Sequence, residues 1–357
     1  YLFSYDLAEL YQITMRYREA ANEYCNLIKA NPAQYQQIES KILSYSNKPG
    51  AIDETIEVVK KFKSYDLSFS YLLARLLIEK ENYEEAFIIY KELDKKGNDK
   101  GRELLSFANF IYRENAFEVA LNVFQYILDN YKNEEIIPAA KLGYAKSKEA
   151  IFVAKYKSAN PEWKTFFIPK AADGKDVQPV IEAYKDITDI YKHSEVAIEA
   201  YLRIGILYEY YLNDNEGAEN YFNIITENYP MSKFNSLALI ELGNIAIQKG
   251  RLDEAEKYFK SVTDLPRANP DDRSYSNYKL SRIFSYKDDF ESARKKLLAV
   301  MGNLKDNLAN DAIEFSILLN NAKNDSSNLS LYCKAEFLTE QHKFEEAKNI
   351  YDQIAQN

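Results

Sequence analysis

Apolar residues in the stretch 237–266 recur at spacings of three and four, with polar residues between them. Leu239, Leu242 and Ala246 follow this spacing before the tripeptide at 249–251, and a second apolar series comes after it. The second series consists of Leu252, Ala255, Tyr258, Phe259 and Val262. Such spacing places apolar side chains on one face of an α-helix. The pattern therefore predicts two amphipathic helices joined by a tight turn.

Small residues mark similar helix pairs along much of the chain. Gly243 and Ala255 lie twelve residues apart, where two antiparallel helices would approach each other closely. The same spacing recurs elsewhere, and the markers at 40, 74 and 108 are each 34 residues apart. The other marker pairs are Ala8 with Ala20, Ser40 with Ile52, Ala74 with Ala86, Ala108 with Ala120, Ser281 with Ala293, and Ala335 with Ala347. A period that repeats in this way indicates a repeat architecture.

One pair is interrupted. Gly143 begins a first helix, but its second helix is expected only near Ala183, so the first helix is extended and a loop is inserted at about 157–177. Proline and glycine within this stretch support a loop. It contains the aromatic residues Trp163, Phe166 and Phe167. These side chains either contact a partner or fold back over the helix pair, and both hypotheses stay open.

Three further irregularities follow towards the C-terminus. Gly205 and Ala218 are thirteen residues apart, which we assign to a longer turn at 212–217. An additional helix is predicted at about 307–322, outside the paired pattern. The chain ends on a packing helix with no polar capping helix after it, although solenoids usually need such a cap. We therefore expect the natural protein to be longer than this chain.

These helix pairs resemble the tetratricopeptide repeat (TPR), a 34-residue helix–turn–helix unit. In that repeat's frame Leu242, Gly243 and Ala255 take positions 7, 8 and 20, and Phe259 takes position 24. Leu239 stands at position 4 in place of the tryptophan typical of the family. The resemblance implies an all-α fold, a TPR-type α-solenoid in which antiparallel helix pairs form a right-handed superhelix. A single solenoid of about nine units is expected over 1–357.

Charge and composition narrow the possible functions. The net charge of −9 argues against general nucleic-acid binding, which favours a basic surface. No apolar run approaches the roughly 18 residues that a membrane-spanning helix needs. Cys25 and Cys333 are the only cysteines and cannot build a disulfide framework. These observations favour no nucleic-acid partner and no membrane span, and they leave the redox compartment open.

Residues for catalysis or metal binding do not gather in any recognisable motif. The two histidines, His193 and His342, lie far apart in the repeat order and are expected at a junction and in a turn. A zinc site requires three or four closely spaced ligands, and phosphate-binding loops and nucleophile elbows have signatures that this chain lacks. We therefore expect no enzyme activity, no cofactor and no metal, and a small-molecule ligand is not favoured.

Two junctions between units share a theme. The stretches 191–200 and 229–238 read Tyr-Lys-His-Ser and Tyr-Pro-Met-Ser, each followed by a helix that begins with alanines nearby. The serine hydroxyl suits a helix N-cap. This theme resembles TPR proteins of the bacterial cell envelope, such as the lipoprotein of the outer-membrane assembly machine and the periplasmic Tol-associated protein. The resemblance implies a periplasmic or outer-membrane-associated location, and a cytoplasmic location is the alternative.

The family binds partners in a concave groove lined by the first helices, and the resemblance carries twelve residues onto that surface. They are Arg75, Arg102, Asn109, Arg113, Arg203, Tyr210, Asn244, Tyr275, Tyr278, Lys279, Arg282 and Tyr286. Glu79, Glu209 and Glu241 share the surface, so it is not uniformly basic. The cations nevertheless suggest a stripe that attracts an acidic or polar extended segment of a partner protein. Extended or helical segments of other proteins are the expected ligands of this groove, and the alternative is a solvated inner face with no single ligand. We expect Arg203 and Arg282 to face solvent there.

The sequence thus predicts a non-catalytic scaffold or adaptor for protein–protein interaction, acting in a bacterial envelope assembly. The alternative is a cytoplasmic peptide-binding regulator, similar to TPR co-chaperones. Their carboxylate clamp needs Lys at position 5 and Asn at position 9 of one unit. Here Asn109 is paired with Leu105, and Asn244 with Ile240, so that clamp is absent.

Overall fold

The computed structural model describes residues 3–97, 99–132, 135–160, 170–302, 308–322 and 325–356. Within these ranges every regular element is helical. The chain divides into two compact units, unit 1 (Tyr1–Thr165) and unit 2 (Phe166–Asn357), and each unit is described by itself. The expectation of one continuous solenoid over 1–357 stays a prediction.

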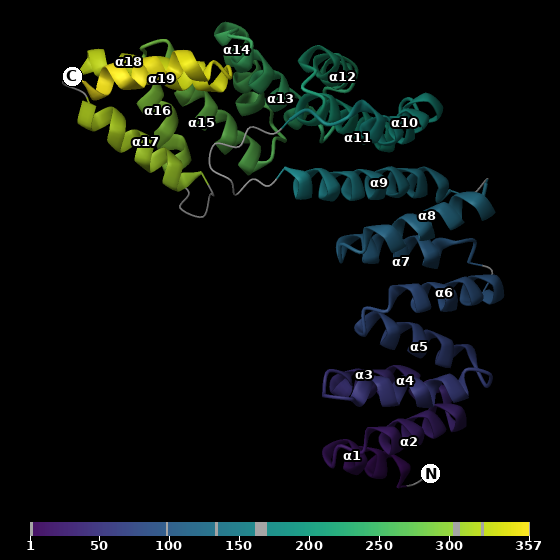
Figure 1. The fold of residues 1–357 in the computed structure, drawn as a ribbon. Coiled ribbons are helices and arrows are strands. Elements are labelled where there is room, and N and C mark those ends of the chain that lie inside the picture. Colours follow the sequence, from purple (N-terminus) through teal and green to yellow (C-terminus); the bar gives the residue numbers. More distant parts are fainter. Residues whose placement is uncertain are drawn as a thin grey trace. The chain divides into compact units, whose positions relative to one another are not determined.

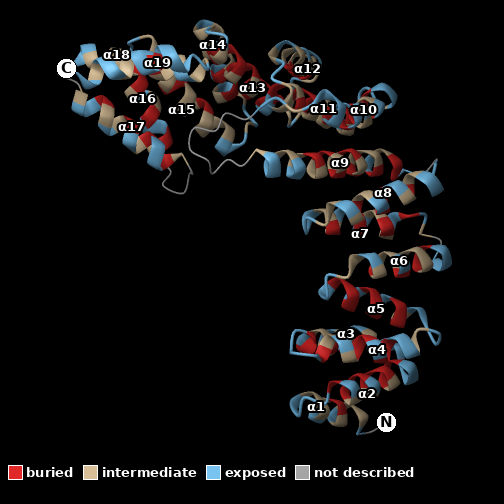
Figure 2. Ribbon diagram, in the orientation of Figure 1, coloured by how far each residue is buried: buried red, intermediate tan, exposed pale blue. Residues whose placement is uncertain are grey.

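Unit 1 consists of consecutive helices that pack on their neighbours in the chain (Figure 1). They are α1 (Ser4–Ile13), α2 (Tyr17–Ala30), the short 3-10 helix η1 (Pro32–Gln34), α3 (Tyr35–Ser46), α4 (Ala51–Phe62), α5 (Leu67–Glu79), α6 (Tyr83–Gly97), α7 (Arg102–Arg113), α8 (Phe117–Asn130) and α9 (Ile137–Ala159). The α-helices bury residues on one side and expose others (Figure 2), as the apolar spacing predicts, whereas η1 buries none.

Unit 2 continues with the same kind of element. Its helices are α10 (Gly174–Ile190), α11 (Glu195–Ile206), the π-helix η2 (Leu207–Tyr211), α12 (Asn215–Asn228), α13 (Asn235–Gln248), α14 (Leu252–Asp264), α15 (Pro270–Tyr286), α16 (Phe290–Met301), α17 (Ala309–Asn321), α18 (Ser326–Glu340) and α19 (Phe344–Ala355). Helix α17 occupies the stretch where an additional helix was expected, and it packs on α16. Helix α18 contacts α13 and α15 as well as its pair partner α19.

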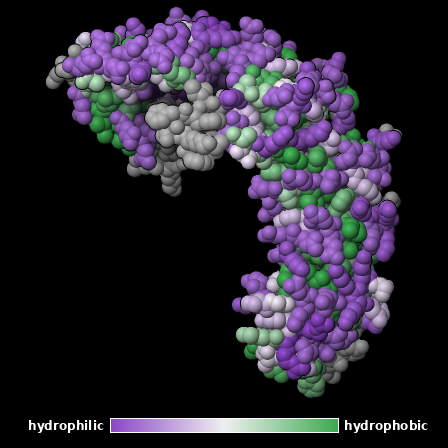
Figure 3. All heavy atoms as spheres, in the orientation of Figure 1, coloured by the Kyte–Doolittle hydropathy of each residue, from purple (hydrophilic) through white to green (hydrophobic). Residues whose placement is uncertain are grey.

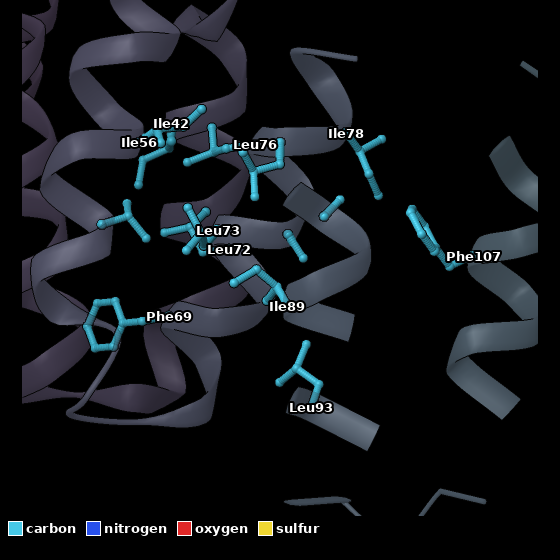
Figure 4. Close-up of a cluster of buried hydrophobic side chains, with 14 of the residues drawn as sticks. Ile42, Ile56, Phe69, Leu72, Leu73, Leu76, Ile78, Ile89, Leu93 and Phe107 are labelled. Carbon is cyan, nitrogen blue, oxygen red and sulfur yellow. The ribbon is translucent and has the colours of Figure 1, made fainter. Parts of the chain in front are cut away.

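The core of unit 1 is a continuous apolar layer between successive helices. Figure 4 shows Leu72 and Leu76 of α5 near Ile56, with Ile89 of α6 on the other side. All four are at least nine-tenths buried. Because helices such as α5 pack on a neighbour at each side, each repeat depends on its neighbours for stability.

Several turns inside the pairs share one backbone geometry. In the α13–α14 turn Gly250 has a φ of 76°, and the Arg251 N–H donates to the Ala246 carbonyl at 2.8 Å. A left-handed residue with this bond across the turn is a Schellman motif, which satisfies free carbonyls at a helix end. Other turns place a non-glycine residue in the left-handed position, among them His342 with a φ of 59°. The tight turn expected at 249–251 is confirmed, and His342 is the turn residue that the repeat frame predicts.

Glycine at position 8 makes room for an aromatic ring. A Cβ built on Gly243 would lie 2.7 Å from the ring of Phe259, and one on Gly205 would lie 2.4 Å from Phe222. Both rings are fully buried. The three atoms nearest to a Cβ at Gly243 all belong to this ring, one turn further along α14 than Ala255, and the expected position of Gly243 opposite Ala255 stays a prediction.

The additional residue between Gly205 and Ala218 lies inside a helix. The Leu212 N–H donates to the Leu207 carbonyl at 3.2 Å, five residues earlier, and this bonding defines the π-helix η2. The turn that follows keeps its left-handed residue, Asn213. The prediction of a longer turn at 212–217 was therefore wrong, because a one-residue insertion can be absorbed as a π-helical turn.

The two junction serines differ in role. Ser194 is the N-cap of α11, and its Oγ accepts from the Ala197 N–H at 3.3 Å. Ser232 also accepts a backbone N–H, from Phe234 at 3.2 Å, but the N-cap of α13 is Phe234 itself. The expected capping role is confirmed at the first junction and wrong at the second.

The visible surface is mostly polar. On the face drawn in Figure 3 polar side chains prevail and apolar ones are scattered between them. Isolated exposed apolar residues of this kind are ordinary. Among the residues that the structure describes, none of the helices combines the length and apolar character that crossing a membrane would require.

Candidate functional site

The twelve predicted partner-binding residues fall into both units. Arg75, Arg102, Asn109 and Arg113 belong to unit 1, and Arg203, Tyr210, Asn244, Tyr275, Tyr278, Lys279, Arg282 and Tyr286 belong to unit 2. The three aromatic loop candidates Trp163, Phe166 and Phe167 lie outside the described residues. Whether the partner-binding residues act as one stripe stays a prediction, and each unit has its own arrangement.

In unit 1 a cavity of about 420 Å³ lies between α5 and α7 and brings two of the predicted arginines together. We call it the α5–α7 cavity. It is lined by Tyr71, Arg75, Ile78, Tyr90, Asp99, Arg102, Glu103, Ser106, Phe107 and Phe110. Tyr90 and Phe107 stack with ring centroids 4.5 Å apart and give it an apolar wall. Two of the predicted cations therefore share one concave site with aromatic side chains.

The acidic side chains of this cavity are engaged within the protein. Tyr71 donates its hydroxyl to Glu103 at 2.9 Å, and the Glu103 N–H donates to Asp99 Oδ2 at 2.9 Å. The arginines are held more loosely. Arg75 pairs with Glu79 at 3.2 Å, and Arg102 pairs with Glu135 at 3.6 Å, with all four side chains at least 40% exposed. Exposed pairs of this kind contribute only about 0–1 kcal/mol, so a partner carboxylate can replace them.

Asn109 and Arg113 do not join the α5–α7 cavity. Both are exposed on α7, and the Arg113 guanidinium donates to the Asn109 carbonyl of its own helix at 3.3 Å. Their predicted role in binding remains untested.

In unit 2 a row of hydrogen bonds joins three successive first helices. Tyr210 of η2 donates its hydroxyl to Glu241 of α13 at 3.0 Å, and Asn244 donates its amide to the same carboxylate at 3.1 Å. Tyr275 of α15 donates to Asn244 Oδ1 at 3.1 Å. We call Tyr210, Glu241, Asn244 and Tyr275 the inner row. Three predicted residues are thus brought together, and they meet around a carboxylate.

Two cations of α15, Lys279 and Arg282, are paired with carboxylates of α18. Lys279 pairs with Glu340 at 3.4 Å, and Arg282 pairs with Glu336. Their side chains are only 15% and 12% exposed. The expectation that Arg282 faces solvent was wrong, because α18 packs against α15 and supplies carboxylates to both cations.

The same contact shapes a second cavity, of about 510 Å³, between α15, α17 and α18. Tyr278 lines it together with Lys279 and Arg282, and the guanidinium carbon of Arg282 lies 4.1 Å from the Phe315 ring centre. Tyr286 lies beside it and stacks on Phe337 of α18 at 5.1 Å. Glu336 and Glu340 were not among the predicted residues. Their spacing of four on one helix face could have indicated them.

Glu209 is the most unusual ionisable group of unit 2. It lies in η2 and is only 5% exposed. Neither of its carboxylate oxygens has a hydrogen-bond partner among the described residues. Burial raises its pKa to about 9, and the nearby carboxylate of Glu241 adds to the rise. Burial also raises the pKa of Glu241. The remaining predicted cation, Arg203, lies half-buried on α11.

Other reactive side chains have structural surroundings. Cys25 and Cys333 are buried free thiols, and burial raises their pKa values to about 12 and about 11. His193 lies 3.2 Å from the hydroxyl of Tyr229 at a unit junction. Within the described ranges no three acidic, histidine or cysteine side chains are grouped so as to hold a metal ion.

Comparison with known proteins adds the following. Residues 206–273 match the family model described as "Tetratricopeptide repeat". No curated protein matches the chain. The matched segment covers η2 through the start of α15, which includes the inner row up to Asn244.

Several solved structures are similar. In the APC/C hetero-tetramer Cut9-Hcn1 the identity is 14%, the likeness covers 95% of this chain and 62% of that chain, and the TM-score is 0.43. The human IFIT1 dimer with m7Gppp-AAAA is 14% identical, with 99% of this chain and 89% of that chain covered and a TM-score of 0.38. Yeast Tom70 is 13% identical, with 99% of this chain and 91% of that chain covered and a TM-score of 0.33. This chain therefore spans less than two thirds of the Cut9-Hcn1 chain. At such identities and scores, what these proteins bind says nothing about this one.

The helix pairs and the matched repeat define an all-α, TPR-type α-solenoid. TPR-type folds present inner surfaces that suit protein–protein interaction, and they are generally not enzymes.

Proposed function

We propose that this protein is a non-catalytic protein-binding scaffold and that the α5–α7 cavity holds part of a partner segment. The observation that carries the proposal is the shared position of Arg75 and Arg102 at a cavity with aromatic walls. Arginine and tyrosine are the residue types that most often anchor interfaces. The cavity's own carboxylates are already bonded, whereas its arginines have only exposed partners.

The partner segment is an extended one that carries an apolar side chain next to a carboxylate. The apolar side chain would contact Phe107 and Tyr90, and the carboxylate would replace Glu79 or Glu135 on an arginine. Arginine can bind a carboxylate through two parallel hydrogen bonds, which gives the contact a direction. Because the pairing is exposed, binding should weaken as salt rises.

The test is affinity capture from the native host, with the captured proteins quantified by mass spectrometry. Arg75→Glu/Arg102→Glu should lose the specific partners that the unaltered protein retains. Lys61→Glu/Lys96→Glu is the matched control, since both lysines are exposed in unit 1, lie outside the cavity and change the net charge equally. If both variants lose the same partners, or neither loses any, the α5–α7 cavity is not the binding site.

We also propose a bacterial cell-envelope location, in the periplasm or at the outer membrane. Its support is the Tyr-Pro-Met-Ser theme at 229–232 and the related stretch from Tyr191. A cytoplasmic peptide-binding regulator is the alternative. Fractionation of native cells separates the two, because release of the protein with the periplasmic fraction supports the first and retention in the cytosol supports the second.

A further inference from the structure

Unit 2 holds a buried carboxyl group for which the protein supplies no partner. Both oxygens of Glu209 are buried and lack a hydrogen-bond donor among the described residues. A buried polar group without a partner costs free energy, commonly about 1–3 kcal/mol and more for a charged group. An incoming donor would remove that cost.

A second carboxylate lies beside it. Glu241 is close enough for its charge to act on Glu209, and it accepts hydrogen bonds from Tyr210 and Asn244. These donors are neutral. The nearest cation of α15, Lys279, is already paired with Glu340. The charge of Lys279 opposes the rise in the pKa of Glu241, whereas Glu209 itself has no hydrogen-bond partner among the described residues.

The helix geometry places this pair beside an accessible side chain. The π-helical turn Leu207–Tyr211 carries Glu209 and Tyr210 in succession; the charge of Glu241 acts on Glu209, and Tyr210 donates to Glu241. The Tyr210 side chain is 51% exposed. π-helical turns arise rarely and are frequent at functional sites. An aromatic face next to two carboxylates is an environment that attracts a cation.

We infer that Glu209 and Glu241 form a binding point for a basic side chain, a lysine or an arginine, of a protein partner. Such a group would lie against the Tyr210 ring and beside Glu241, and it would donate to the Glu209 oxygens once the residues that bury them have moved aside. This inference rests on the proposed scaffold function but uses a different unit and the opposite charge. It reverses the expectation of an acidic ligand for this part of the chain.

Binding of a cation at this site should release a proton from Glu209, and this release can be measured. Since burial keeps Glu209 protonated near neutral pH, a bound cation must displace that proton. The groups that face the pair are Tyr210, Tyr275 and Lys279, and none of them needs to lose a proton for the cation to bind. Binding should therefore release up to about one proton for each ligand bound.

The experiment is calorimetric titration of the full chain with the peptide acetyl-Ala-Lys-Ala-Lys-Ala-Lys-amide near neutral pH. Two buffers that differ in ionisation enthalpy report the proton release. The same peptide with norleucine in place of lysine, and one with glutamate, serve as ligand controls. We expect binding of the lysine peptide alone, with proton release.

Two variants locate the site. Glu209→Gln/Glu241→Gln should weaken the lysine peptide roughly tenfold or more, which corresponds to about 1.4 kcal/mol, and should abolish proton release. Glu345→Gln/Glu346→Gln is the matched control, because both residues are exposed on α19 and change the net charge equally. It should change affinity less than about twofold.

Three results would overturn the inference: no binding of the lysine peptide, binding without proton release, or equal loss in both variants. The last would mean that net charge alone attracts the peptide. If the Glu209 variant does not fold, the proton release of the unaltered protein still decides. Loss of capture by Arg75→Glu/Arg102→Glu concerns the α5–α7 cavity only, so the two proposals can fail separately.

Discussion

The guanidinium of Arg282 on α15 forms an ion pair with Glu336 on α18, and the two side chains are only 12% and 26% exposed. The ion pair links α18 to α15, which is the first helix of its pair in unit 2. The ring of Phe315 lies under the guanidinium and adds a cation–π contact. Helix α18 is thus held by charge as well as by apolar packing.

Removing one member of this pair should destabilise the protein. Arg282→Met keeps the apolar stem but leaves Glu336 without its cation, and we expect a loss of about 2–4 kcal/mol. Glu336→Gln should cost a similar amount. The double variant should cost less than the sum, because the two changes remove one shared interaction. Denaturant unfolding of the four proteins measures this coupling.

Arg75→Met is the control for that cycle. Arg75 also pairs with a glutamate, Glu79, but both side chains are at least 40% exposed. Its replacement should change stability by less than about 1 kcal/mol. If Arg282→Met is as mild as Arg75→Met, the buried pair does not stabilise α18.

Gly243 is expected to tolerate no larger side chain. A Cβ there would lie 2.7 Å from the Phe259 ring, so Gly243→Ala should cost about 1–3 kcal/mol. Phe259→Leu in the same chain should recover part of this loss, since a smaller side chain leaves space for the methyl group. Gly174→Ala is the matched control, because nothing lies within 4 Å of its Cβ position. Thermal melting of the three variants checks the order, and equal melting of the two alanine variants would contradict it.

Ala255 tests the repeat frame at a second position. It is fully buried on α14, so Ala255→Leu should lower the melting temperature through overpacking, at a cost of about 1–3 kcal/mol. Lys257→Ala is a suitable exposed control two residues further on. Lys249 is less suitable, because it pairs with Glu219 at 2.8 Å. A leucine variant that melts like the control would refute the frame.

The sequence could predict the helix pairs because their causes are local. The spacing of Leu239, Leu242 and Ala246 determines one helix face, and Gly250 supplies the left-handed residue that its turn needs. These features act within a few residues of each other. Gly243 was rightly identified as a close-packing position, although its neighbour is Phe259, because the frame gives spacing along the helix and not the direction of a ring.

The charge pairing of the inner surface could not be predicted in this way. Lys279 and Arg282 occupy inner positions of α15, but their carboxylates come from α18, beyond the additional helix α17. Where α18 packs depends on contacts distant in sequence. The one-residue insertion after Gly205 was visible, yet spacing alone could not decide between a longer turn and the π-helix that carries Glu209.

Glu209 should make stability fall as pH rises. Its folded-state pKa is about 9, above the ordinary value of 4.5, so between these pH values the folded state binds a proton that the unfolded state has lost. The stabilisation is fully present below pH 4.5 and disappears as pH rises through about 9. The slope can reach about 1.4 kcal/mol per pH unit, since one pKa unit corresponds to that free energy.

The measurement is the free energy of unfolding of the unaltered protein minus that of Glu209→Gln, at several pH values between 6 and 9. The difference isolates Glu209 from other groups that titrate, including Glu241, whose pKa is also raised by burial. We expect the unaltered protein to lose stability relative to the variant as pH rises, by at least about 1 kcal/mol over two pH units. The exposed replacement Glu345→Gln should show no such trend. A difference that does not change with pH would mean that Glu209 is ionised in the folded protein and already has a counter-charge, which would also remove the basis for a vacant cation site.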